Sequence, residues 1–140
     1  MTSSELFYES FKRCRIDQEF LESFLADFCK HNPRFSERFE NIGLEQQTKM
    51  LKASIILIHN SVGLPSVRNS VRKLGKRHKD LGLNISEQEL NEWFQSLLNT
   101  VKKYDPHYDA QVEQAWTETF DVGLKIMKKS VWSEPKCVTK

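Results

Sequence analysis

Apolar side chains recur at intervals of three and four residues through almost the whole chain, and this spacing constrains the fold more than any other feature. Such spacing places the apolar residues on one face of an α-helix, whereas a half-buried strand would alternate apolar and polar residues. No long stretch shows that alternation, and the chain has few breakers, with five glycines and four prolines. The chain is therefore predicted to be all-α.

The predicted helices cover about residues 3–14, 17–31, 44–60, 87–103 and 109–129, with a further helix after Pro65 and a short piece at 33–42. Asp17 is a suitable N-cap for the second helix, and Pro33 ends it because proline cannot continue the hydrogen-bond ladder. Ser86 and Glu89 form a capping box, S-x-x-E, at the start of the helix over residues 87–103. About seven helices with short links and no repeat predict an orthogonally packed α fold.

The length of 140 residues, with 39% hydrophobic residues, indicates one domain with a real core. We predict a domain over residues 1–131 and a flexible tail over 132–140, with the stretch SVWSEPKCVTK frayed. No segment approaches the roughly 20 apolar residues that span a bilayer. The N-terminus lacks the basic and apolar regions of a secretory signal. A cytoplasmic protein without a membrane partner is expected.

Two classes of site are disfavoured by their missing signals. Cys14, Cys29 and Cys137 are odd in number and contain no CxxC pair, which disfavours a disulfide framework and a zinc site. Cys29 is expected to pack in an apolar face. The chain also contains no GxSxG sequence, Gly-rich phosphate loop, HExxH sequence or plausible Cys/His pair. No catalytic residue is predicted.

His78 lies on the predicted apolar face of the helix after Pro65, four residues after Leu74 and three before Leu81. A buried imidazole needs a partner, since an unsatisfied polar group costs about 1–3 kcal/mol. Spacing alone favours a hydrogen-bonded core histidine over a metal ligand. The other histidines are too scattered for zinc. Haem stays open, because the porphyrin supplies four nitrogens and one protein imidazole completes the proximal side.

Cationic side chains surround His78 in the sequence: Arg68, Arg72, Lys73, Lys76, Arg77 and Lys79. Cations along one helix could neutralise nucleic-acid phosphates. However, no aromatic residue is interleaved with them, and acidic residues elsewhere hold the net charge at +2. A solvated outer face is favoured and no nucleic-acid partner is expected. A third interpretation pairs one or two of these cations with haem propionates.

Four segments, FLADFCKHNPRFSERF, LEQQTKMLKASIILIHN, LPSVRNSVRKLGKRH and AWTETF, together resemble the globin family. The likeness is to single-domain bacterial haemoglobins and to the globin domain of flavohaemoglobins, over about residues 5–130. It implies a three-over-three helical sandwich around a b-type haem.

The resemblance implies roles for individual residues. His78 matches the proximal iron ligand, and the spacing from Gln46 to His78 runs without a gap against the bacterial pattern LEQ, NxxxLP, His. Gln46 matches the distal position, with Gln47 as the alternative if the register slips by one. Met50 matches an apolar residue of the ligand pocket. The alternative register would place Lys52 where the family buries an apolar side chain, which favours Gln46.

Other positions follow from the same resemblance. Pro33 matches the proline that opens the short third helix, and Phe39 matches a phenylalanine stacked against the haem. Arg77 or a neighbour is a possible propionate partner. The remaining positions implied to contact the cofactor are Leu25, Phe28, Phe35, Leu74, Leu83, Leu90, Trp93 and Phe120.

The sequence departs from the family pattern at three positions. Leu25 stands where bacterial members commonly place a tyrosine that hydrogen-bonds bound oxygen. Phe120 replaces a tyrosine of the last helix that is associated with the polar network behind the proximal histidine. Leu90 likewise stands where a tyrosine is expected. The resemblance then implies a weak push of electrons from the proximal histidine toward the iron. It also leaves Gln46 as the one obvious distal hydrogen-bond donor.

The resemblance implies reversible binding of O₂, CO and NO, for oxygen delivery or NO handling. A neutral hydrogen bond contributes about 0.5–1.5 kcal/mol, so lacking one speeds oxygen release up to about tenfold. Modest affinity and fast release are expected. The length leaves no room for flavin and nicotinamide domains, so NO dioxygenase or weak peroxidase activity would need an external reductase. The alternatives are a gas or redox sensor that signals to a separate partner, and a haemless module or basic nucleic-acid binder.

Overall fold

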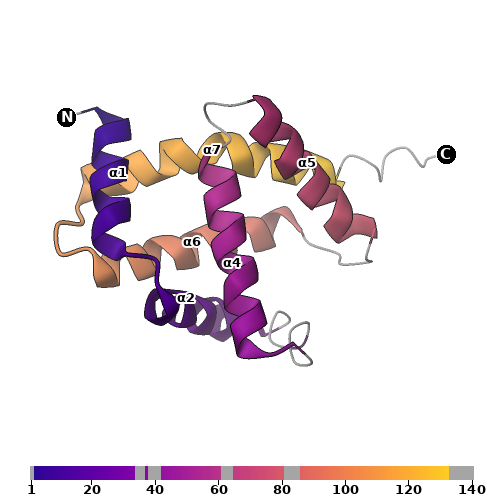
Figure 1. Cartoon of the computed structure of the whole chain (residues 1–140), viewed down its shortest axis with the longest axis horizontal. Coiled ribbons are helices and arrows are strands. Elements are labelled where there is room, and N and C mark those ends of the chain that lie inside the picture. Colours follow the sequence, from indigo (N-terminus) through magenta and orange to yellow (C-terminus); the bar gives the residue numbers. More distant parts are fainter. Residues whose placement is uncertain (1, 34–36, 38–41, 61–64, 81–85, 133–140) are drawn as a thin grey trace.

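The computed structural model describes residues 2–33, 37, 42–60, 65–80 and 86–132 (Figure 1). Its helices within those ranges are α1 (Ser3–Cys14), α2 (Gln18–His31), α4 (Leu44–Asn60), α5 (Pro65–Asp80), α6 (Glu87–Tyr104) and α7 (Ala110–Trp132). The predicted bounds agree to within a residue except at the end of α7. The expectation of a frayed SVWSEPKCVTK segment is wrong for residues 130–132, which are helical. The short piece predicted at 33–42 lies mostly outside the described residues.

Local side-chain chemistry sets the helix starts. The Asp17 carboxylate accepts a hydrogen bond from the Phe20 amide at 3.1 Å, which confirms Asp17 as the N-cap of α2. The predicted capping box is also confirmed: the Glu89 amide donates to the Ser86 hydroxyl at 3.0 Å, and the Ser86 amide donates to Glu89 Oε1 at 2.9 Å. These bonds satisfy amides that have no partner inside the helix.

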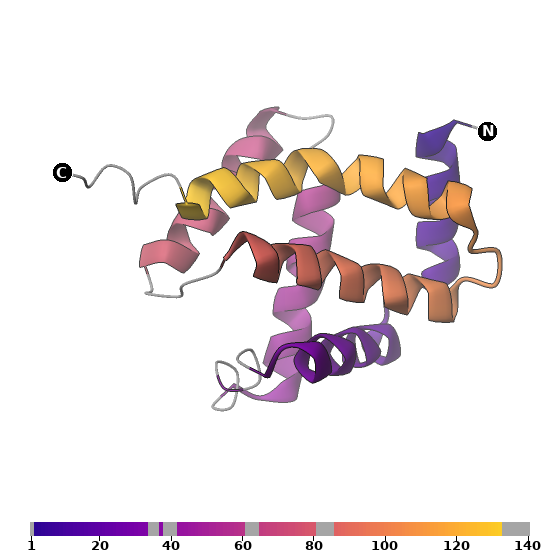
Figure 2. The ribbon, with the colours of Figure 1, turned by 180° about the vertical axis from the view of Figure 1, so that it is seen from behind.

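The helices form two layers (Figures 1 and 2). Helices α1, α4 and α5 lie in front in Figure 1, whereas α2, α6 and α7 lie behind them, and Figure 2 shows α6 and α7 side by side. Contacts of α7 with α1, α4 and α5, and of α2 with α4, join the layers, whereas α2 contacts α6 within its own layer. The predicted three-over-three all-α arrangement is confirmed.

The main core confirms two of the predicted apolar faces. Every residue of the two predicted stripes is buried: Phe20, Leu21, Phe24, Leu25 and Phe28 on α2, and Val112, Trp116, Phe120, Leu124 and Met127 on α7. Cys29 is half-buried against the same core, as expected. On α4, spacing predicts a stripe of Met50, Leu51, Ser54, Leu57 and Ile58, and this prediction is partly wrong. Met50 is 36% exposed and Ile55, which the prediction omitted, is fully buried, because α4 packs through Thr48, Leu51, Ile55 and Ile58.

A second, smaller cluster holds α5 in place. Val71 of α5, Leu90 of α6 and Met127 of α7 are buried together, and Leu57, Leu74 and Ile126 pack against them. The cluster therefore draws on α4, α5, α6 and α7. It fixes the position of the helix that contains residue 78.

Candidate functional site

The described structure covers the candidate residues unequally. His78 and Arg77 lie in the last turns of α5, but their side chains are outside the described part of the chain. Phe35, Phe39 and Leu83 lie outside the described residues altogether. The roles assigned to these five residues stay predictions.

The two candidate distal glutamines differ in their surroundings on α4. Gln46 is exposed, whereas Gln47 is half-buried and its Nε2 donates to the Ile42 carbonyl at 2.5 Å. The two registers also differ at the position that the family buries. The Gln46 register places Leu51 there, and Leu51 is buried; the Gln47 register places Lys52 there, and Lys52 is exposed. Both observations favour Gln46.

The other described candidates divide between the two clusters. Leu25, Phe28 and Phe120 are buried in the main core, and Trp93 packs against it, with its ring 5.4 Å from the Phe24 ring in an edge-on contact. Leu74 and Leu90 belong to the second cluster around Val71. Gln46 and Met50 belong to neither cluster. The structure thus places the candidates on the inner faces of α2, α5, α6 and α7 and on the open face of α4.

A surface hollow lies away from these residues, between α1 and the start of α7. Its lining residues are Ser3, Leu6, Ala110, Gln111 and Gln114. None of them is a candidate and none carries a group that titrates near neutral pH. We therefore assign no chemistry to this hollow.

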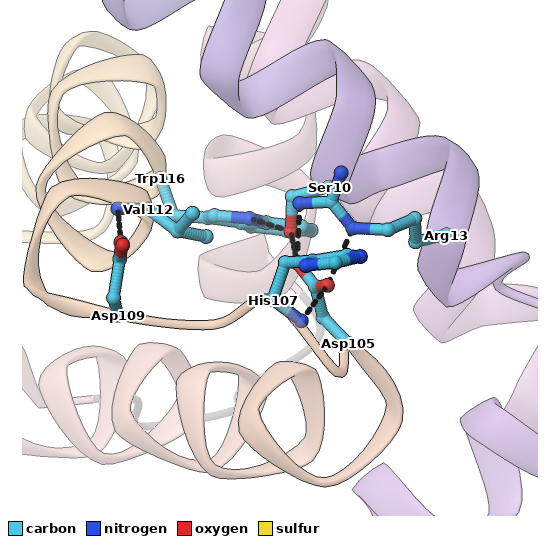
Figure 3. A network of polar contacts seen from close by, with 7 residues as sticks. All are labelled: Ser10, Arg13, Asp105, His107, Asp109, Val112 and Trp116. Atoms are coloured by element: carbon cyan, nitrogen blue, oxygen red, sulfur yellow. Dashed lines mark hydrogen bonds and ion pairs between the residues drawn. The ribbon is translucent and has the colours of Figure 1, made fainter.

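A buried polar network, which spacing along the sequence did not predict, joins α1 to the α6–α7 connection (Figure 3). Arg13 donates to Asp105 through Nε at 2.5 Å and through Nη2 at 3.0 Å. The Ser10 hydroxyl donates to the same carboxylate at 2.6 Å and accepts the Trp116 indole N–H at 2.9 Å. The His107 amide completes the set at 2.9 Å from Asp105 Oδ1. We call these five residues the corner network.

The charge state of the corner network follows from its hydrogen bonds. Burial raises the pKa of Asp105, but the donors on Arg13, Ser10 and the His107 amide outweigh it, so the net pKa lies below the usual value. The carboxylate is therefore ionised and paired. Nearby, burial raises the pKa of the Cys14 thiol to about 12. A paired carboxylate and a protonated thiol indicate a structural role for this corner.

His59, near the end of α4, was also missed as a feature. Its ring is half-buried among the rings of Phe7, Phe11 and Phe120, with centroid separations of 5.4, 5.0 and 6.4 Å. Burial lowers the pKa of this imidazole. The neutral ring therefore packs as an aromatic residue between the two layers.

Within the described ranges, no three His, Cys, Asp or Glu side chains lie close enough together to hold a metal ion. No helix in the described part of the chain is long and apolar enough to cross a membrane.

Comparison with protein families decides the identity of the fold. The globin family model matches residues 5–127, which is most of the chain. The chain belongs to the globin family. The resemblance inferred from the sequence is thus confirmed. Membership supports a haem-binding globin in general terms.

A solved structure agrees with this assignment. This globin is similar to a protein from Pseudomonas aeruginosa PAO1 described as structurally highly homologous to a human hemoglobin, with a TM-score of 0.82 and 24% sequence identity. The alignment covers 93% of this globin and 98% of the other chain. At this identity the likeness shows the fold alone. Curated protein sequences gave no significant match.

Proposed function

We propose that this globin binds b-type haem between α4 and α5, with His78 as the proximal iron ligand, and that it binds O₂, CO and NO reversibly. The family match over residues 5–127 carries the proposal, because it includes both helices and His78 itself. The second cluster supports it by holding α5 against α4, α6 and α7. When bound, the iron porphyrin supplies an open coordination position for a diatomic gas.

The open face of α4 suits an apolar cofactor. Met50 is 36% exposed, although its side chain is large and apolar. Covering such a side chain fully contributes about 1.5–3 kcal/mol relative to exposure. A planar macrocycle against α4 would bury part of this surface. Gln46, one turn before Met50, would then place its amide beside the bound gas.

The buried residues around this region favour release over retention of oxygen. Leu25 is buried on α2 and offers no hydrogen bond to a ligand, which leaves the Gln46 amide as the proposed distal donor. Phe120 is fully buried among aromatic rings and offers no hydroxyl behind the proximal side. These features support fast oxygen release and weak peroxidase-type activation.

A sensor function is the second candidate, and the direct packing of α5 against α4 and α7 favours it. A change at the iron that moves α5 would be passed to both of these helices. A separate partner would read that movement. Equal backbone amide exchange of α5 in the deoxy and CO-bound forms would exclude this function.

The test of the proposed function is a haem titration followed by absorbance. We expect a Soret band that saturates at one haem per chain, and a shift of the ferrous band with CO. His78→Ala should abolish or severely weaken the band, whereas the matched variant His107→Ala, at an exposed histidine, should leave it unchanged. A wild-type chain that stays haem-free at micromolar haem would overturn the proposal.

A further inference from the structure

The net charge of +2 conceals a strong separation of charge along the chain. Residues 46–79 contain eight Lys or Arg and no Asp or Glu, whereas the rest of the chain contains 13 basic and 19 acidic residues. The segment from 46 to 79 therefore carries +8 and the remainder −6. It covers nearly all of α4 and α5.

Five described cations of this segment are exposed. They lie on two helices of the same layer (Figure 1). We call them the cationic face: Lys49 and Lys52 on α4, and Arg72, Lys73 and Lys76 on α5, all exposed. Their spacings of three and four put each group on one side of its helix. No described residue forms an ion pair with any of the five; Arg72 donates to the Asn69 side-chain oxygen at 2.5 Å.

Some lysines elsewhere on the molecule have an acidic partner on their own helix. Lys12 pairs with Glu9 at 3.2 Å, and Lys125 pairs with Asp121 at 3.0 Å. In the cationic face like charges stand together without such compensation, which costs free energy unless an anionic partner or salt screens them. The concentration of unpaired charge on one side indicates a surface for an acidic partner.

An exposed apolar residue lies on the α4 part of this surface. Ile56 is 41% exposed and follows Lys52 by four residues and Lys49 by seven, so the three share one side of α4. Apolar contacts surrounded by charge are typical of protein–protein interfaces. The described parts of α4 and α5 expose no Phe, Tyr or Trp on which bases could stack. The composition therefore favours a protein over a nucleic acid.

We propose that the cationic face docks an acidic electron-transfer protein that reduces the haem iron. The inference rests on the proposed function, because α5 carries both the cations and His78. The transfer is a one-electron step: the reduced iron–sulfur or flavin centre of the partner loses one electron, and the ferric iron gains it. Charge complementarity of this kind raises the association rate and makes it fall with ionic strength.

Binding can be tested without electron transfer. The probe is an oxidised, acidic plant-type [2Fe–2S] ferredoxin, titrated into the CO-bound, isotope-labelled protein. We expect amide shifts concentrated on residues 49–56 and 68–76, and binding that weakens from 10 to 300 mM salt. Shifts spread over α2 and α6, or binding insensitive to salt, would overturn the proposal.

Charge-reversal variants provide the matched comparison. Lys73→Glu/Lys76→Glu and Lys49→Glu/Lys52→Glu change the cationic face, whereas Lys30→Glu/Lys102→Glu makes the same change in net charge at exposed sites on α2 and α6. We expect the first two variants to slow reduction of the ferric protein by reduced ferredoxin at least about tenfold at low salt. The third should slow it less than about twofold.

The outcomes separate this inference from the proposed function. Equal slowing in all three variants would show a net-charge effect and overturn the docking surface. Preferential binding to anionic lipid vesicles or duplex DNA over ferredoxin, lost in the first two variants, would overturn the choice of partner. Either result with a normal Soret band leaves haem binding intact. A missing Soret band in the wild type would overturn the proposed function instead.

Discussion

The corner network and the α4–α5 side use polar residues in opposite ways. In the corner, the buried Asp105 carboxylate receives hydrogen bonds from Arg13, Ser10 and the His107 amide. On the other side, α4 exposes Met50 and a glutamine, and lysines of the cationic face stand without described ion pairs. Buried polar groups that are paired add rigidity, whereas exposed apolar groups beside unpaired charge indicate binding. The corner network therefore serves stability, whereas the α4–α5 side is where we propose that ligands and partners bind.

Removing the carboxylate should break the corner. Asp105→Ala leaves the Arg13 guanidinium and the Ser10 hydroxyl without their acceptor, and breaking a buried ion pair costs about 3–5 kcal/mol. Because Arg13 is partly exposed, we expect a loss near about 3 kcal/mol in the free energy of unfolding, measured by urea denaturation. The exposed pair offers the control: Asp121→Ala should cost less than about 1 kcal/mol. Equal losses would contradict the structural role of the corner.

The same carboxylate should set part of the acid sensitivity. Its pKa in the fold is lowered, so its contribution to stability is present above the unfolded pKa near 3.8 and is lost as the pH falls below that value. Between pH 5 and 3, the free energy of unfolding of the wild type should therefore fall more steeply than that of Asp105→Asn. Parallel acid profiles for the two proteins would argue against an ionised Asp105.

His59 lies between the two regions, and its burial predicts a second pH dependence of stability. Burial lowers its pKa below 6.5, so the unfolded chain takes up a proton first. Its contribution to stability is complete above about pH 6.5 and declines as the pH falls, by at most about 1.4 kcal/mol per pH unit. Urea midpoints at pH 7.5 and 5.5 should differ less in His59→Phe than in the wild type, while His107→Phe should match the wild type. An unchanged difference in His59→Phe would contradict this.

Variants of the two glutamines of α4 test which of them donates a hydrogen bond to bound oxygen. Gln46→Leu should speed oxygen release up to about tenfold, because it removes one hydrogen bond to the ligand. Gln47→Leu should change the rate less, since its amide is bonded to the Ile42 carbonyl. Flash photolysis and stopped-flow mixing measure the rates. The opposite ranking would move the distal role to Gln47, and slow release by the wild type would exclude the fast-release account.

The sequence predicted the fold well where residues act within one helix. Periodicity identified the buried faces of α2 and α7, and side-chain chemistry located Asp17 and the Ser86 capping box. The misplaced stripe on α4 has a physical reason. Met50 and Leu51 are consecutive and both apolar. Which of the two faces α2 and α7 depends on how the helices pack, and spacing alone does not determine this.

Contacts between distant residues could not be predicted in this way. Asp105 directly follows the end of α6, and its partner Arg13 lies 92 positions earlier in the chain. Likewise His59 meets Phe7 only because the fold brings the end of α4 close to α1. For the candidate site, His78 could be identified as a proposed iron ligand only through the family resemblance, because spacing alone favoured a hydrogen-bonded core residue.

We propose that the imidazole of residue 78 holds the haem iron, and a variant that lacks this imidazole provides the strongest test. The measurement is the absorbance spectrum of His78→Gly with one equivalent of haem, before and after addition of free imidazole. We expect the Soret band to be lost or strongly weakened and imidazole to restore it, while the wild type is unaffected. A His78→Gly protein with a wild-type spectrum before imidazole is added would show that His78 does not hold the iron.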